Sequence, residues 1–158
     1  ARAHYETTGP EIWGQAGGKV DVFIAGVGTG GTITGIGRYL KGQAPQVEVV
    51  AVEPASSPLL SGGQAGAHGL QGIGANFVPE LLDASVYDRV ETVTEEEAYA
   101  AGRAFAVTEG ILVGISAGAA LHVGKKLAVQ PAYAGKSIVV LLPDTGDRYL
   151  STALFGGA

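Results

Sequence analysis

The chain has 158 residues, of which 46% are hydrophobic and 16% charged, and its formal net charge is -5. This composition predicts one domain around a single core, and it argues against nucleic-acid and anionic-membrane partners because the sequence has no basic stripe. The absence of cysteine excludes a disulfide framework and a thiolate metal site. No apolar run is long enough for a membrane span, and no secretory signal is visible. We therefore expect a cytoplasmic protein without a metal.

The first third of the chain predicts a helix followed by a strand, a turn, a helix and a strand. Thr8-Gly9-Pro10 opens the first helix, because proline in a first turn sacrifices no hydrogen bond. The apolar runs at 20–25 and 47–52 predict strands, and helical spacing of apolar residues predicts a helix at 32–40. This order is a βαβ unit, and the continuous apolar character is typical of parallel strands covered on both faces.

The remaining chain continues the alternation of strands and helices. Residues 54–79 are rich in glycine, serine and proline, and so long a loop without periodicity is more often functional than a plain connector. Further along we expect a strand at 89–93, a helix opened by the capping box at 94–97, an extended segment at 111–115, a helix at 116–128 and a strand at 137–142. The predicted class is therefore α/β, with a mainly parallel sheet and helices on both faces.

The stretch AGVGTGGT at 25–32 lies where the first predicted strand meets a helix. Gly26, Gly28 and Gly31 match the G-x-G-x-x-G pattern, and Glu53 stands at the end of the next strand, so an NAD(P)-binding domain of a dehydrogenase is one interpretation. The hydroxyls of Thr29 and Thr32 favour another interpretation, in which backbone amides and hydroxyls hold a terminal phosphate at a helix N-terminus. A turn that uses glycine only for packing is the third.

A second turn of this kind precedes the helix at 116–128. EGILVGIS ends an apolar run with a glycine and places Ser116 at the helix entrance. A serine there is most often an N-cap. Because ligands of open parallel sheets bind beyond the carboxyl ends of the strands, the two turns are also placed to hold opposite ends of one flat cofactor.

Several short motifs resemble the cysteine synthase (O-acetylserine sulfhydrylase) family, whose members are pyridoxal-phosphate enzymes of the tryptophan-synthase β fold, also called fold type II. In chain order they are AGVGTGGT at 25–32, AVEP at 51–54, SGG at 61–63, QGIGANF at 71–77, EGILVGIS at 109–116 and LPDTGDRYLST at 142–152. The resemblance implies that Gly28, Thr29, Gly30, Gly31 and Thr32 wrap the cofactor phosphate, that Ser116 bonds the pyridine nitrogen, and that Gln71, Gly72, Ile73 and Gly74 line the substrate side.

The resemblance also implies an activity and partners. The expected reaction replaces the acetoxy group of O-acetyl-L-serine by sulfide and gives L-cysteine and acetate; a related cystathionine β-synthase-type replacement is an alternative. A homodimer is implied, as is a possible complex with the C-terminal tail of serine acetyltransferase.

The lysine that carries the cofactor in this family is not found in the sequence. It belongs to a segment that precedes the phosphate loop, and none of the lysines at 19, 41, 125, 126 and 136 has that context. We therefore expect residues 1–158 to be the C-terminal, phosphate-binding part of a two-domain enzyme. By itself this chain is expected to be inactive.

Overall fold

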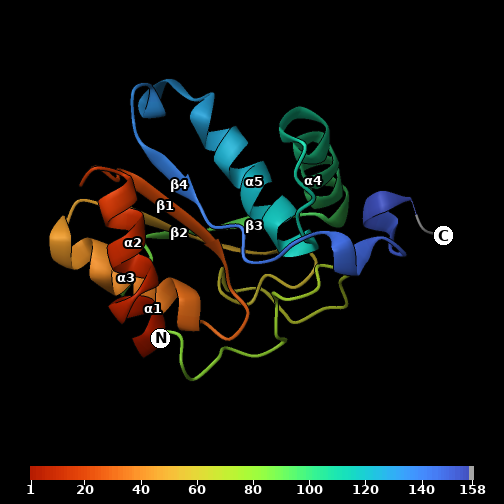
Figure 1. The fold of residues 1–158 in the computed structure, drawn as a ribbon. Helices are drawn as coiled ribbons and strands as arrows, with labels where there is room; N and C mark the ends of the chain where they lie inside the picture. The colour runs from red at the N-terminus through yellow and green to blue at the C-terminus, as the bar shows by residue number, and fades with distance from the viewer. Residues whose placement is uncertain (157–158) are drawn as a thin grey trace.

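A four-stranded parallel sheet forms the centre of the computed structural model, which describes residues 1–156 (Figure 1). The strands are β1 (Val22–Gly26), β2 (Glu48–Pro54), β3 (Arg89–Val93) and β4 (Ile138–Val140), in the spatial order β3-β2-β1-β4. In the central register Ile24 pairs with Val50 on one side and with Val140 on the other. Since every pairing is parallel, the carboxyl ends of the strands meet along one edge.

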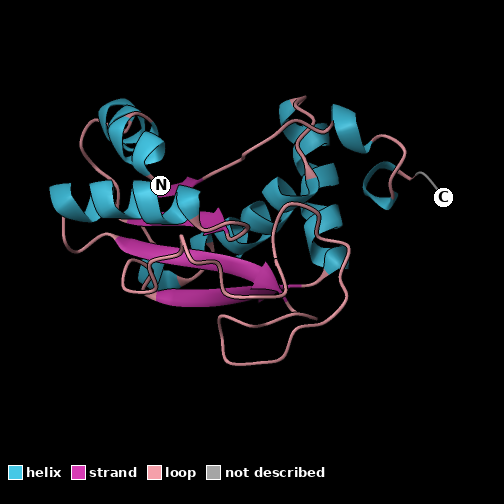
Figure 2. Ribbon diagram, turned by 90° about the horizontal axis from the view of Figure 1, so that it is seen from below, coloured by secondary structure: helices cyan, strands magenta, loops and turns pink. Residues whose placement is uncertain are grey.

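Helices cover both faces of this sheet (Figures 1 and 2). One layer holds α1 (Arg2–Glu6), α2 (Thr8–Gln15) and α3 (Gly31–Gln43), and the other holds α4 (Glu95–Glu109) and α5 (Ile115–Ala128). Short 3-10 turns lie at Pro131–Tyr133, Asp147–Tyr149 and Ala153–Phe155. The predicted α/β class, with a parallel sheet between two helical layers, is confirmed.

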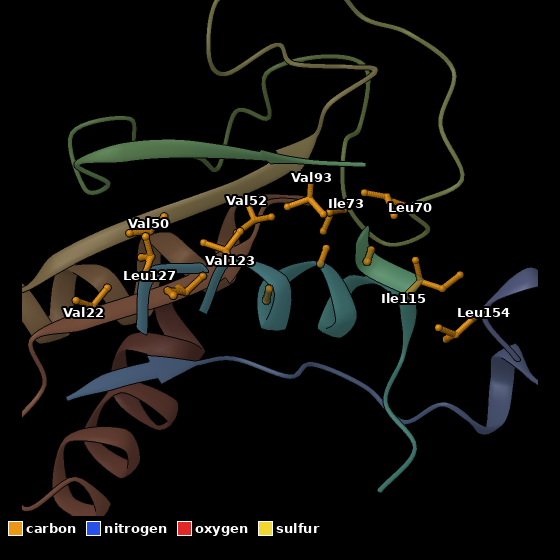
Figure 3. Packing of buried hydrophobic residues seen from close by; sticks show 14 of the residues in the cluster. Val22, Val50, Val52, Leu70, Ile73, Val93, Ile115, Val123, Leu127 and Leu154 are labelled. Atoms are coloured by element: carbon orange, nitrogen blue, oxygen red, sulfur yellow. The ribbon is translucent and has the colours of Figure 1, made fainter. Parts of the chain in front are cut away.

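Alternate residues of β1 divide the core into two clusters. Val22 and Ile24 belong to the cluster under α5, part of which Figure 3 shows, whereas Phe23 and Ala25 belong to the cluster under α3. All four are fully buried, which accounts for the continuous apolar run in the sequence. Burial of each larger side chain contributes about 1.5–3 kcal/mol, so both helices are held firmly against the sheet.

The structure departs from the expected elements in three places. Helix α1 precedes the first helix that the sequence predicts. The extended segment at 111–115 joins the sheet nowhere and makes a single antiparallel bridge, between Val113 and Thr145. Val113 and Ile115 are buried, whereas Ile111 and Leu112 are exposed, and α5 takes Ile115 as its first residue. Among the described residues, no helix is long and apolar enough to cross a membrane.

Candidate active site

A cavity of about 180 Å³ opens beside the carboxyl ends of β1 and β4. It lies where the N-termini of α3 and α5 come together, as expected for ligand sites of open parallel sheets. Its walls come from four separate segments, and its lining residues are Gly26, Gly28, Thr29, Gly30, Thr32, Gly72, Ile73, Ser116, Leu141 and Pro143. The cavity thus joins the two strand-to-helix turns that the sequence singled out.

The first wall is the N-terminus of α3, and it has no cap from a side chain. Gly30 is the N-cap residue, and the first backbone bond of the helix runs from the Thr34 N–H to the Gly30 carbonyl at 3.1 Å. Within residues 1–156, the amides from Gly28 to Ile33 have no acceptor. Free N–H groups at the positive end of a helix dipole are a binding site for an anion.

The glycines of this wall are required by close approach of other segments. A Cβ on Gly28 would overlap the carbonyl oxygen of Gly72, and one on Gly30 would lie 2.6 Å from the Cβ of Leu82. Gly30 also has φ +82, a left-handed conformation that a side chain would strain. Here the sequence needs glycine for tight contact, and that contact brings the loop containing Gly72 to the cavity.

A hydrogen-bond chain reaches Thr32 from the first two helices. The Thr32 hydroxyl lies 3.3 Å from His4 Nε2, and His4 Nδ1 lies 2.9 Å from the Thr8 hydroxyl. When His4 Nε2–H donates to Thr32 Oγ1, the Thr32 proton is free to point into the cavity. Sequence analysis missed His4, and the only signal for it is its spacing of four residues from Thr8.

Ser116 forms part of the opposite wall, at the start of α5. The residue is 6% exposed and faces the cavity, and its hydroxyl makes no hydrogen bond to the described residues. Gly114 is the N-cap residue of α5 and receives no side-chain cap, so the interpretation of Ser116 as an N-cap is wrong. Because Ser116 lines the cavity, its hydroxyl is free to bond a ligand there.

The segment 71–74 contributes only two of its residues to this cavity. Gly72 and Ile73 line it, whereas Gln71 is exposed and Gly74 lies outside the lining, with its N–H donated to the Val27 carbonyl at 3.0 Å. Gly31, the first residue of α3, is buried and also lies outside the lining. A substrate role for these residues stays a prediction.

Glu53 is engaged in a way that removes the basis of the dinucleotide interpretation. Its side chain is 2% exposed and accepts from the Leu60 N–H at 2.7 Å, the Ser61 N–H at 3.0 Å and the Ser61 hydroxyl. A carboxylate that binds a ribose needs free acceptor positions facing a cleft. Glu53 instead holds the loop that follows β2.

A strap of chain crosses the start of α5 from the C-terminal side. The Gly114 N–H donates to the Asp144 carbonyl at 3.2 Å, and the Tyr149 hydroxyl donates to Asp144 Oδ2 at 2.5 Å. That bond, assisted by burial, raises the pKa of Tyr149 to about 12. The described residues contain no cluster of three or more side chains suited to a metal ion.

Comparison with known proteins agrees with this geometry. Residues 1–144 match the family described as pyridoxal-phosphate dependent enzyme. The chain belongs to this family. The uncapped end of α3 and the unpartnered Ser116 hydroxyl fit the family's cofactor, which carries a phosphate at one end and a ring nitrogen at the other.

Several members of this pyridoxal-phosphate family are close in sequence or structure. Cysteine synthase from Haemophilus influenzae is 54% identical over 161 residues, covering 98% of this chain and 51% of that protein. Cysteine synthase A from Escherichia coli is 51% identical over 160 residues, covering 96% and 50%. The crystal structure of cysteine synthase from Entamoeba histolytica superposes with a TM-score of 0.95 at 40% identity, covering 98% and 45%. The chain therefore spans about half the length of the curated relatives that it matches.

Proposed function

We propose that the protein containing this chain is a cysteine synthase, which replaces the acetoxy group of O-acetyl-L-serine by sulfide and releases L-cysteine and acetate. The curated relatives carry that name at about 50% identity. The observation that carries the proposal is one cavity with free helix-end amides on one wall and an unpartnered buried serine on the other.

The phosphate is assigned to the N-terminus of α3. The amides of Gly28 to Thr32 donate to its oxygens, and the hydroxyls of Thr29 and Thr32 add two further donors. With its Nε2–H as the donor, His4 would bond the Thr32 hydroxyl oxygen and leave the Thr32 proton free for the phosphate. Because the donors are fixed by the backbone, binding requires little reorganisation of the protein.

Ser116 is assigned to the ring nitrogen at the other end. When bound, pyridoxal phosphate supplies the electron sink for bond changes at the α and β carbons of the substrate. The Ser116 hydroxyl is neutral and, unlike a carboxylate, does not hold a neighbouring nitrogen in its protonated form. This choice limits electron withdrawal and favours β-replacement over transamination.

The cofactor lysine is assigned to a part of the protein outside this chain. No lysine lines the cavity among the described residues, and two of them are engaged elsewhere: Lys41 with Asp88 at 2.7 Å and Lys126 with Glu91 at 2.7 Å. In this proposal residues 1–158 form the C-terminal, phosphate-binding domain. The coverage of about half of each relative supports that division.

The proposal extends to assembly and location. The resemblance to cysteine synthases leads us to expect a homodimer and a cytoplasmic location. It also leads us to expect that the C-terminal tail of serine acetyltransferase docks near the active site. Size-exclusion chromatography with light scattering, and titration with a peptide of that tail, test the first two.

The activity is tested with the full-length protein loaded with pyridoxal phosphate. O-acetyl-L-serine and sulfide should yield L-cysteine, whereas L-serine and homocysteine should yield little cystathionine. Titration with NADH, followed by fluorescence, should give no saturable binding. Faster formation of cystathionine would favour the related β-replacement, and tight NADH binding would overturn the proposal.

A further inference from the structure

The loop that supplies Gly72 and Ile73 to the cavity is closed by a histidine. His68 Nε2 lies 2.7 Å from the Gly74 carbonyl oxygen, and a carbonyl can only accept, so Nε2 carries the proton. His68 Nδ1 is buried and has no partner among residues 1–156. The His68 ring is therefore tied to the loop through Nε2 alone.

Gly74 is held on both sides by this arrangement. Its carbonyl accepts from His68 while its N–H donates to the Val27 carbonyl at 3.0 Å, directly after β1. A Cβ on Gly74 would lie 2.6 Å from both His68 Nε2 and Pro54 Cγ, and its φ of +69 is left-handed. Gly74 therefore lies tightly against both the imidazole ring and Pro54, at the end of β2.

The other end of the loop is anchored on α4. The Gly69 N–H donates to Glu95 Oε1, the Tyr99 hydroxyl donates to the Gly69 carbonyl at 3.4 Å, and Leu70 is fully buried in the core (Figure 3). Between the two anchors, the Gly72 carbonyl contacts Gly28. Inside the loop, the Gln71 N–H donates to the Gly69 carbonyl at 2.9 Å and the Ile73 N–H donates to the Leu70 carbonyl at 3.4 Å. The His68 side chain adds a bond to Gly74, next to the two residues that line the cavity.

We propose that His68 is a positioning residue for the amino-acid substrate. Its bond to Gly74 helps to fix the wall formed by Gly72 and Ile73, which lies beside Ser116. The inference rests on the proposed function, because the substrate is the one assigned there. Loss of the bond loosens this wall and weakens substrate binding, while the α3 amides and Thr32 continue to hold the phosphate.

Three substitutions in the full-length protein test this role. The amide nitrogen of glutamine reaches about as far as imidazole Nε2, whereas that of asparagine reaches only as far as Nδ1. His68→Ala and His68→Asn should therefore lose the bond, and His68→Gln should restore it. His122→Gln is the matched control, since His122 lies on α5 near Glu97 and away from the loop.

Two measurements read the result. Without cofactor or substrate, hydrogen exchange at residues 69–75 should be about tenfold faster in His68→Ala and His68→Asn, the factor expected for one lost hydrogen bond. In the loaded enzyme, KM for O-acetyl-L-serine should rise about tenfold, with kcat within about twofold. His68→Gln and His122→Gln should resemble the parent protein in both.

The outcomes that overturn the inference are distinct from failure of the proposed function. A positioning role would be contradicted if His68→Ala left both hydrogen exchange and KM unchanged, or if exchange became faster throughout α3, α4 and α5. It would also be contradicted if His68→Gln folded but did not restore the parent exchange rate and KM. Faster loop exchange with an unchanged KM would also contradict it. A parent protein that makes no cysteine refutes the function, and the exchange measurement still reports on the His68 bond.

Discussion

Two helices of this molecule begin at the carboxyl ends of strands, and their first turns are built in opposite ways. At α4, the Thr94 hydroxyl accepts from the Glu97 N–H at 3.2 Å while Glu97 accepts from the Thr94 N–H at 2.9 Å, and Glu95 to Glu97 are all acidic. At α3, the N-cap is glycine, no side chain caps the turn and no acid lies in it.

The first turn of α4 is capped by its own side chains, whereas in our proposal that of α3 is capped by a ligand. Both helix ends have the same free amides and the same positive dipole end. At α4 the capping box uses the chain's own side chains: the Thr94 hydroxyl accepts from the Glu97 N–H, and the Glu97 carboxylate accepts from the Thr94 N–H. At α3 no side chain supplies such a cap, and we propose that the cofactor phosphate takes its place in the cavity there.

The largest effect should come from giving α3 an anion of its own. Thr29→Asp places a carboxylate beside the free amides, where it competes with the cofactor phosphate and repels it. Like charges in contact cost several kcal/mol, so affinity of the full-length protein for pyridoxal phosphate should fall by a factor of about 100 or more. Thr29→Asn, similar in size and uncharged, should fall much less; equal losses would mean that charge at this turn is irrelevant.

Substitutions on the two walls of the cavity should have smaller effects, and the effects should differ in kind. Thr32→Ala removes one hydroxyl donor from the phosphate and should weaken cofactor binding about tenfold, as expected for a bond to a charged group. Ser116→Ala should leave cofactor affinity nearly unchanged and slow turnover. Equilibrium dialysis of the cofactor and kcat measured on both variants test this, and an equal loss of cofactor in the two would contradict the division of roles.

A still smaller effect is expected at the self-capped helix. Thr94→Ala should destabilise α4 by about 1 kcal/mol, the usual value for a lost N-cap, with no change in cofactor affinity. Hydrogen exchange of the α4 amides measures the first quantity and dialysis the second. If cofactor affinity fell along with helix stability, the two helix ends would not be independent.

The pH dependence of the capping box should be the smallest effect. The backbone hydrogen bond from Thr94 lowers the pKa of Glu97 below 4.5. A lowered pKa gives stability that is present above the ordinary value and is lost as pH falls through the folded-state value. The difference in urea midpoint between the parent protein and Glu97→Gln should therefore disappear on acidification; a difference that persists at pH well below that pKa would show that the carboxylate's charge is not involved.

Much of the fold was predictable because it depends on local patterns. Largely apolar runs predicted the strands near 20–25 and 47–52, and the capping box predicted where α4 begins. The segment at 111–115 looked like a further strand because its residues are apolar, yet only Val113 makes a bridge. A short apolar run does not reveal by its pattern whether it pairs as a strand, and Ile111 and Leu112 of this segment are in fact exposed.

The site was predictable where the chemistry lies in one turn, and not where it joins distant segments. The glycine turn and Ser116 stand out in the sequence, and the structure places both on one cavity. The bond from His68 to Gly74 and that from His4 to Thr32 have no periodic signature, since each depends on how a loop or helix returns to the site. Glu53 matched the dinucleotide pattern by spacing alone, and only the loop folded onto it excludes that role.

The central claim is that the free amides at the start of α3 bind a phosphate dianion. It is tested most directly by following backbone amide NMR signals of the full-length protein during titration with pyridoxal phosphate and, separately, with NADH. The account predicts that pyridoxal phosphate shifts the amides of residues 28–33 and of Ser116 and leaves those of residues 95–97 unchanged. The account would be contradicted if NADH shifted the signals of residues 28–33 and those near Glu53 while pyridoxal phosphate shifted none at residues 28–33.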